Sequence, residues 1–255
     1  MFVEKALLQL ALAAAVEAAR EIMEVYARDF SVEEKQDSSP LTEADTRSHV
    51  AIERRLSKAP GALYVLSEEG TTIPPAERRN WRRFWMVDPL DGTKEFIKKN
   101  GEFTVNIALM EADEEGAAKP MAGIIFAPYL RELFVGEAGI GAFRLRRGAD
   151  EPAPDLGELV ATGERLPVAG GERPYTIVAS RSHLSPETQA FIDERKGAHP
   201  DLETISAGSS LKICRVAEGA ADEYPRFAPT MEWDTAACDA VARAAGCKVL
   251  AWEPD

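Results

Sequence analysis

Apolar residues in the first thirty positions recur at helical spacing. Leu8, Leu12, Ala19 and Ile22 fall on one face, and the charged residues between them lie largely off it. A period near 3.6 residues predicts one amphipathic helix over residues 2–30. This alanine-rich stretch faintly resembles the apolar part of a signal peptide, but charges near its start and the continuing helical pattern favour the helix.

A second helix is predicted to begin at Thr42-Glu43-Ala44-Asp45. Thr42 is a suitable N-cap, Asp45 is the acid three residues on, and apolar residues follow at helical spacing. Considered alone, Asp45 can be explained as a first-turn acid that favours the helix dipole.

Short apolar runs separated by Gly, Pro and acidic turns occupy the middle of the chain. They predict strands over residues 62–66, 84–87, 103–110, 121–126, 132–135 and 142–145. Runs of this kind with turns between them indicate an antiparallel sheet. The polar segment 71–83, which contains Pro74-Pro75, is predicted to be a surface loop.

The pattern changes after residues 146–173, which are rich in Gly, Pro and acids. Strands are predicted over residues 175–179, 202–205, 221–224 and 248–251, and helices from Ser185-Pro186, over 211–218, and up to Ala244. Alternating strands and helices indicate an α/β arrangement. We therefore predict an α/β (α+β) protein with an N-terminal domain over residues 1–155 and a C-terminal domain over residues 156–255.

Composition limits the partners. The chain has 255 residues, of which 45% are hydrophobic and 29% charged, and its net charge is −13. That charge opposes attraction to nucleic-acid polymers or anionic membranes, so an anionic substrate needs local Lys, Arg or bound cations. The acidic balance can also simply maintain solubility. No stretch is long enough to span a membrane.

Cysteine and histidine usage argues against zinc chemistry. The three cysteines form no CxxC pair and the three histidines are scattered. This fits a reducing cytosol in which the cysteines are small core residues; Cys238 in particular is expected to pack inertly.

The candidate chemistry centres on Asp88-Pro89-Leu90-Asp91-Gly92-Thr93, directly after the apolar run 84–87. Pro89 and Gly92 predict a tight loop that ends the strand. Carboxylates held on such a turn suit a hard divalent cation. Further acids at element ends are Asp45, Glu68, Glu69 and Asp234, and each has a plain alternative as a solvated turn or cap residue. An all-carboxylate set favours Mg²⁺ or Mn²⁺.

These motifs resemble a known superfamily. Asp-Pro-Leu-Asp-Gly-Thr, preceded by Ser-Glu-Glu and followed far downstream by Trp-Asp-Thr-Ala-Ala, is similar to the inositol monophosphatases, which are Mg²⁺-dependent, lithium-inhibited phosphatases. Residues 39–45, 94–97, 101–104, 179–183, 208–212, 224–226 and 229–234 resemble, more narrowly, the CysQ-type 3′(2′),5′-bisphosphate nucleotidases. The resemblance spans essentially the whole chain and implies a layered αβαβα sandwich.

The resemblance also implies roles for individual residues. The implied metal ligands are Glu68, Asp88, the Leu90 carbonyl, Asp91 and Asp234. Asp45, Thr93 and Glu68 are the implied catalytic residues, and of these Asp45 and Thr93 orient and deprotonate the attacking water. Glu69, next to the ligand Glu68, is implied to support that ligand or to bind a third ion. The implied cofactor is two or three Mg²⁺ ions, with Mn²⁺ as an alternative and Li⁺ as an inhibitor.

The implied substrate contacts are Gly92, Thr93, His183, Ser209, Lys212, Arg226 and Asp234. Lys212 follows Gly-Ser-Ser at a helix start, which suits an anion, although a solvated lysine beside an ordinary N-cap explains it equally. His183 is placed near the adenine by the resemblance; by itself it is an ordinary surface-loop residue. Family members usually continue through a further basic, aromatic segment, so the residues that form part of the nucleotide pocket, or only its outer wall, are not identified by the resemblance.

The working hypothesis is a phosphatase that hydrolyses the 3′-phosphate of adenosine 3′,5′-bisphosphate (PAP) to AMP, with the sulfated form PAPS as a further substrate, in sulfur assimilation. It would act in the cytoplasm as a monomer or homodimer, and peripheral association with the inner membrane face is left open. One rival is an inositol-phosphate phosphatase on the same scaffold. Lys212 and Arg226 argue against it, because a substrate with one phosphate needs no second anion site. Another rival is a catalytically inactive metal- or nucleotide-binding protein.

Overall fold

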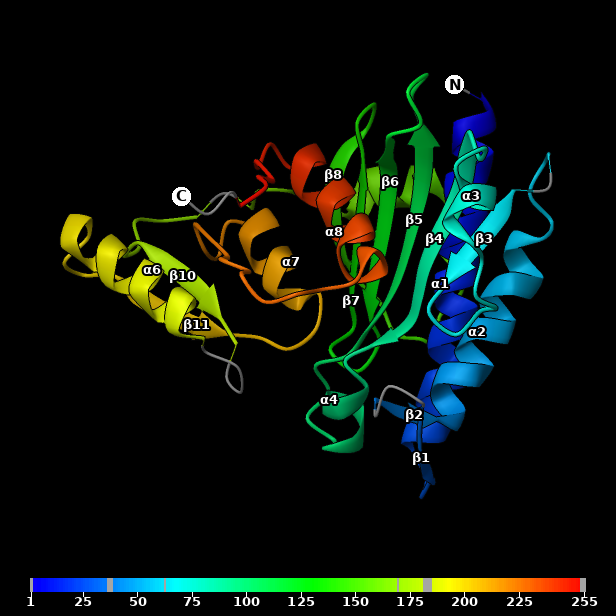
Figure 1. Ribbon diagram of the computed structural model, residues 1–255, viewed down its shortest axis with the longest axis horizontal. Coiled ribbons are helices and arrows are strands. Elements are labelled where there is room, and N and C mark those ends of the chain that lie inside the picture. The colour runs from blue at the N-terminus through cyan, green and yellow to red at the C-terminus, as the bar shows by residue number, and fades with distance from the viewer. Residues whose placement is uncertain (1, 36–38, 62, 169, 181–184, 253–255) are drawn as a thin grey trace.

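The computed structural model describes residues 2–35, 39–61, 63–168, 170–180 and 185–252. Figure 1 shows layers in the order helix, sheet, helix, sheet, helix. The layers are α1 (Phe2–Tyr26) with α2 (Glu43–Leu56), a large sheet, α7 (Leu211–Ala217) with α8 (Glu232–Ala244), a small parallel sheet of β10 (Thr176–Ala179) and β11 (Glu203–Ser206), and α6 (Pro186–Ala198). The predicted layered αβαβα fold is confirmed.

The large sheet has seven strands within the described residues, in the order β3-β4-β5-β6-β7-β8-β9. They are β3 (Tyr64–Ser67), β4 (Arg83–Asp91), β5 (Thr104–Ala112), β6 (Ala118–Ala127), β7 (Glu132–Glu137), β8 (Gly141–Arg146) and β9 (Glu164–Arg165). β3 is parallel to β4, and every later neighbour pair is antiparallel. The antiparallel sheet predicted over residues 103–145 is therefore correct. A separate hairpin joins β1 (Val32–Glu34) to β2 (Pro40–Thr42).

Both faces of the large sheet are buried, because helices pack on each side of it. Successive side chains of a strand point to opposite faces and so join two different cores. Trp85 and Val87 join the core beneath α1 and α2. Phe84 and Met86 join the core beneath α7 and α8. The apolar run 84–87 is continuous, without polar alternation, because β4 faces helices on both sides.

Helix α8 lies directly on the sheet because two strand positions have no side chain. A Cβ at Gly123 would come within 2.0 Å of the Ala237 carbonyl oxygen, and one at Gly136 within 2.4 Å of the Val241 Cα. This close approach fixes the height of α8 and of Asp234 in its first turn.

Several predicted boundaries were wrong. β4 does not end at Val87 but continues through Pro89 to Asp91, with a register shift between Asp88 and Asp91. Proline is tolerated there because a bulge frees it from the regular ladder of hydrogen bonds. Helix α1 ends at Tyr26, not at residue 30. The predicted loop 71–83 contains the short helix α3 (Pro75–Arg78), which has proline in its first turn.

The C-terminal half also departs from the predicted pattern. The predicted strand 221–224 is reduced to a single bridge between Ile177 and Glu223, and residues 248–251 form no strand. After α5 (Leu156–Thr162), β9 pairs with β8, so the large sheet includes residues beyond 155. The division at residue 155 stays a prediction. In the described part of the chain, no helix has the length and apolarity needed to cross a membrane.

Candidate active site

The first turn of α2 holds Asp45 in a defined orientation. Thr42 accepts a hydrogen bond from the Ala44 amide at 3.2 Å, and Asp45 Oδ2 accepts from the Thr42 amide at 2.8 Å and hydroxyl at 2.6 Å. The predicted cap is thus confirmed. The other oxygen, Asp45 Oδ1, accepts from the Thr93 hydroxyl at 3.1 Å. Burial raises the pKa of Asp45, while the bonds from Thr42 and Thr93 oppose that rise.

The end of β4 is held from two sides. Ser48 of α2 donates to the Pro89 carbonyl at 2.7 Å, and the Leu90 amide donates to Asp88 Oδ1 at 3.1 Å. Thr93 Oγ1 also lies 3.3 Å from the Leu90 carbonyl oxygen. Gly92, with φ +90°, turns the chain into α4 (Thr93–Ile97). A left-handed φ favours glycine, so this residue sets the direction of the turn.

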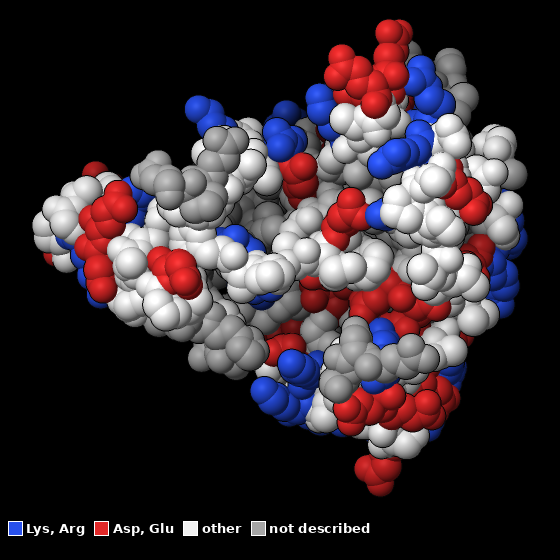
Figure 2. Space-filling view, in the orientation of Figure 1, with Lys and Arg blue, Asp and Glu red and all other residues white. Residues whose placement is uncertain are grey.

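Carboxylates gather around Asp88, whose side chain is almost completely buried. Burial raises the pKa of Asp88 well above its usual range, and the charges of Asp91, Glu68 and Asp234 raise it further. Figure 2 shows acidic side chains gathered along the hollow in the middle of this face. Such a cluster is unfavourable by itself and favours a bound cation.

Lys35 supplies a cation at this cluster. Its ammonium group donates to Glu68 Oε1 at 3.0 Å and also to Glu69. Burial lowers the pKa of Lys35, but its hydrogen bonds to Glu69 and Glu68 outweigh burial and raise the pKa overall. The sequence interpretation missed Lys35, and its only local signal is a lysine beside a polar loop.

Asp91 faces the C-terminal half of the chain. Its Oδ2 accepts from the Ser209 hydroxyl and the Ser210 amide, each at 2.7 Å, and from the Ser210 hydroxyl. Asn106 donates to the same oxygen at 3.3 Å. These bonds tie the end of β4 to the start of α7. Asn106 and Ser210 were absent from the predicted site residues.

Asp234 is held in the first turn of α8. Its Oδ2 accepts from the Thr230 hydroxyl at 2.7 Å and the Met231 amide at 3.0 Å. Burial raises the pKa of Asp234, and the charge of Asp91 adds to the rise. As the side chains stand, no three His, Cys, Asp or Glu residues in the described ranges close into a ligand set. The donors nevertheless fit a hard cation, since they are all oxygens, mutually repelling and partly neutralised by an ammonium group.

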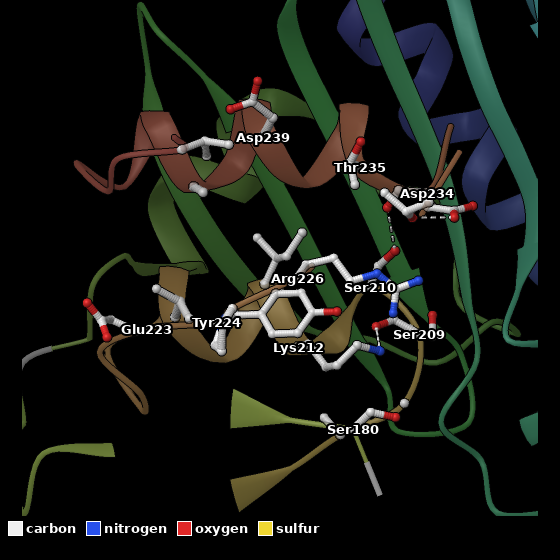
Figure 3. A pocket seen from close by; sticks show the side chains of 18 of the residues that line it. Ser180, Ser209, Ser210, Lys212, Glu223, Tyr224, Arg226, Asp234, Thr235 and Asp239 are labelled. Carbon is white, nitrogen blue, oxygen red and sulfur yellow. Dashed lines mark hydrogen bonds between the residues drawn. The ribbon is translucent and has the colours of Figure 1, made fainter. Parts of the chain in front are cut away.

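A cavity of about 1250 Å³ opens beside these acids. Asp91, Gly92 and Asp234 line it together with Lys212 and Arg226. Figure 3 shows Lys212, Arg226 and Tyr224 grouped near Ser209 and Ser210. The structure thus brings the predicted substrate residues Gly92, Ser209, Lys212, Arg226 and Asp234 to one cavity, whereas His183 lies outside the described residues.

Lys212 and Arg226 each donate a hydrogen bond to a backbone carbonyl near the cavity. Lys212 Nζ donates to the Ser209 carbonyl at 2.6 Å and lies 5.8 Å from the centre of the Tyr224 ring. Burial lowers the pKa of Lys212, and burial raises the pKa of Tyr224 to about 12. Arg226 donates to the Pro229 carbonyl at 3.0 Å. Cys238 is buried nearby in the core, as predicted.

Comparison with known proteins gives a consistent result. The model of the inositol monophosphatase family matches residues 4–255. The 3′(2′),5′-bisphosphate nucleotidase CysQ of Salmonella typhimurium is 43% identical over 236 residues, which cover 91% of this chain and 85% of that protein. The crystal structure of CysQ from Bacteroides thetaiotaomicron superposes with a TM-score of 0.84 at 48% identity, covering 95% of this chain and 87% of that one. The chain belongs to the inositol monophosphatase family.

Proposed function

We propose that this protein is a 3′(2′),5′-bisphosphate nucleotidase that removes the 3′-phosphate of PAP and releases AMP and phosphate. The observation that carries the proposal is one cavity lined by both carboxylates and cations. Its acidic region consists of Asp91 and Asp234, and its cationic region consists of Lys212 and Arg226. A substrate with two phosphates can place one at each region, whereas a monophosphate leaves the cations unused. The name of the relatives at 42–43% identity supports the same assignment.

The acidic region would hold the divalent cations. The residues that would bind them are Glu68, Asp88, the Leu90 carbonyl, Asp91 and Asp234, and this all-oxygen set suits Mg²⁺, with Mn²⁺ as an alternative. When bound, such ions make water more acidic and neutralise charge on phosphate oxygens. In the protein, Lys35 donates to Glu68 Oε1 and Ser210 to Asp91 Oδ2, so a cation would compete for these oxygens or bind the second oxygen of each carboxylate.

The proton path lies within the chain. In the proposed reaction the Thr93 hydroxyl faces the attacking water, accepts its proton and passes its own to Asp45, along the hydrogen bond of 3.1 Å. Asp45 suits this role, because burial favours its neutral form while Thr42 holds its other oxygen. The amides of Gly92 and Thr93 would hold oxygens of the cleaved phosphate. Glu68 would keep the water oriented.

The cationic region would hold the phosphate that is not cleaved. Lys212 and Arg226 supply the charge, and Ser209 presents a hydroxyl between the two regions. The sulfated form of the substrate carries its sulfate on this same phosphate and keeps a negatively charged group there, so it is a further candidate. His183 completes the proposed set on the adenine side. A cytoplasmic location, a role in sulfur assimilation and a monomeric or dimeric state remain predictions.

A phosphate-release panel with Mg²⁺ tests this proposal. PAP, PAPS, AMP and inositol 1-phosphate are compared at equal concentration, with PAP expected to turn over fastest. Replacing Arg226 by Ala should lower kcat/KM for PAP at least about tenfold, because a charged hydrogen bond to phosphate is lost, and should change inositol 1-phosphate turnover little. Faster turnover of the inositol ester by the wild-type protein would overturn the proposal in favour of the rival phosphatase.

A further inference from the structure

Glu95 lies in the first turn of α4 and lines the same cavity as Asp91 and Lys212. Two glycines, Gly92 and Gly208, provide the space that its side chain occupies. A Cβ on Gly92 would lie 3.4 Å from Glu95 Oε2, and a Cβ on Gly208 would lie 2.9 Å from its Cγ. Two residues without side chains, more than a hundred positions apart, therefore border this half-buried acid.

The carboxylate of Glu95 has no hydrogen-bond or ion-pair partner among the residues the structure describes. The neighbouring acids differ, since Asp45, Asp91 and Asp234 each accept hydrogen bonds from the protein. Lys212 is close enough to attract Glu95, but its ammonium group donates to the Ser209 carbonyl instead. Glu95 therefore presents free acceptor oxygens to the cavity.

Carboxylate oxygens without a protein partner favour a ligand group that donates hydrogen bonds. An ionised carboxylate accepts hydrogen bonds only, so it pairs with a hydroxyl or amine and repels a phosphate. The position is informative as well, since Glu95 Oε2 lies beside Gly92, whose amide is proposed to hold the cleaved phosphate. A group bonded there belongs to the substrate next to the scissile ester.

We propose that Glu95 accepts a hydrogen bond from the hydroxyl on the carbon adjacent to the cleaved phosphate ester, which in PAP is the ribose 2′-hydroxyl. This inference rests on the proposed function and adds a specificity residue to it. Glu95 favours a neutral vicinal hydroxyl and disfavours a second anionic group at that position. It contacts substrate and takes no part in proton transfer.

The test compares PAP with 2′-deoxyadenosine 3′,5′-bisphosphate, which lacks only that hydroxyl. The kcat/KM values are measured for the wild-type protein and for Glu95→Ala, Glu95→Gln and the control Glu114→Gln. Glu114 is an exposed acid in the turn between β5 and β6, so its variant removes the same charge at a remote place. The wild-type protein and the control should prefer PAP about tenfold or more, the worth of a hydrogen bond to a charged acceptor.

Glu95→Ala should lose that preference, with the activity on PAP falling to that on the deoxy analogue and the latter changing less than about twofold. Glu95→Gln keeps the shape and should retain an intermediate preference, which also covers the case in which the alanine variant does not fold. Equal losses on both substrates would overturn the role of Glu95 while leaving the proposed function intact. A wild-type protein that hydrolyses neither nucleotide would refute the proposed function and, with it, this role.

Discussion

The Thr93 hydroxyl donates to Asp45 Oδ1 at 3.1 Å and thereby joins the turn after β4 to the first turn of α2. The two residues are 48 positions apart, and each is fixed by its own element. Asp45 is held by Thr42, and Thr93 follows Gly92 at the start of α4. A hydroxyl and a buried carboxylate in this relation form a short route for a proton.

Replacing Thr93 by Val should abolish that route. We expect kcat for PAP to fall by about 10²–10⁴, the range for losing a positioned proton-transfer group. Thr93→Ser keeps the hydroxyl and should stay within about tenfold of wild type. Thr235→Val is a matched control, because Thr235 lines the cavity beside the acids and, within the described residues, its hydroxyl donates to the Glu232 carbonyl and not to a carboxylate. Steady-state phosphate release gives kcat for all three variants. A kcat of Thr93→Val within threefold of the wild-type value would exclude the proposed proton route.

Asp88→Asn should separate activity from stability. Asp88 is buried among carboxylates that raise its pKa, so a neutral amide removes repulsion while keeping the volume. We expect activity to vanish and the unfolding temperature in chelator to stay equal or rise. Added Mg²⁺ should raise the unfolding temperature of the wild-type protein and of the exposed control Asp29→Asn, but not of Asp88→Asn. A clearly lower unfolding temperature of Asp88→Asn than of the wild-type protein in chelator would contradict the proposed repulsion between Asp88 and its neighbouring carboxylates.

Lys35→Met should strengthen metal binding. Lys35 neutralises Glu68 and Glu69, so its ammonium group competes with a divalent cation for the same oxygens. The Mg²⁺ concentration for half-maximal activity is expected to fall severalfold, on the order of 1 kcal/mol of competing interaction. Lys58→Met removes an exposed lysine in the turn after α2 and should leave the required Mg²⁺ concentration unchanged. An increase in the required Mg²⁺ would show that Lys35 assists the metal instead.

Arg215 is predicted to be a main support of α7. It donates to Glu132 of β7 at 2.8 Å and to Glu218 at 2.7 Å, and both carboxylates are nearly inaccessible. Arg215→Met removes one of the two arginine partners of each buried carboxylate, leaving Arg146 on Glu132 and Arg144 on Glu218, and should lower the free energy of unfolding by about 1.5–3 kcal/mol. Arg146 also pairs with Glu132, at 3.2 Å, but its side chain is 63% exposed. Arg146→Met should cost less than about 1 kcal/mol in the same urea titration; equal costs would contradict the role of burial.

Asp222 should make stability depend on pH in the acid range. Burial raises its pKa, but hydrogen bonds from Arg173 and the Thr176 amide outweigh this and lower the pKa below its usual 3.8. A carboxyl whose pKa is lower in the folded state stabilises the fold above its unfolded pKa, and this contribution is lost as pH falls through the folded value. Unfolding midpoints from pH 7 to pH 3 should therefore fall more steeply for wild type than for Asp222→Asn. The exposed control Asp201→Asn should follow wild type.

The sequence by itself determined what depends on residues a few positions apart. The Thr42 cap with Asp45, the Ser185-Pro186 helix start and the antiparallel strands from residue 103 to residue 145 all follow from local patterns. Caps and alternation arise from backbone groups and side chains within one turn or one strand. The carboxylate turn at Asp88 was recognised in the same way.

Only the tertiary structure decided which distant residues meet. Asp91 accepts from Ser210, 119 positions later, and Lys35 reaches Glu69 from the β1–β2 hairpin. The glycines of β6 and β7 set the height of α8 and so place Asp234 near Asp88. Similarly, β4 runs through Pro89 because β5 continues to pair with it beyond the bulge. These contacts depend on how whole layers pack, and no local pattern of the chain encodes that packing.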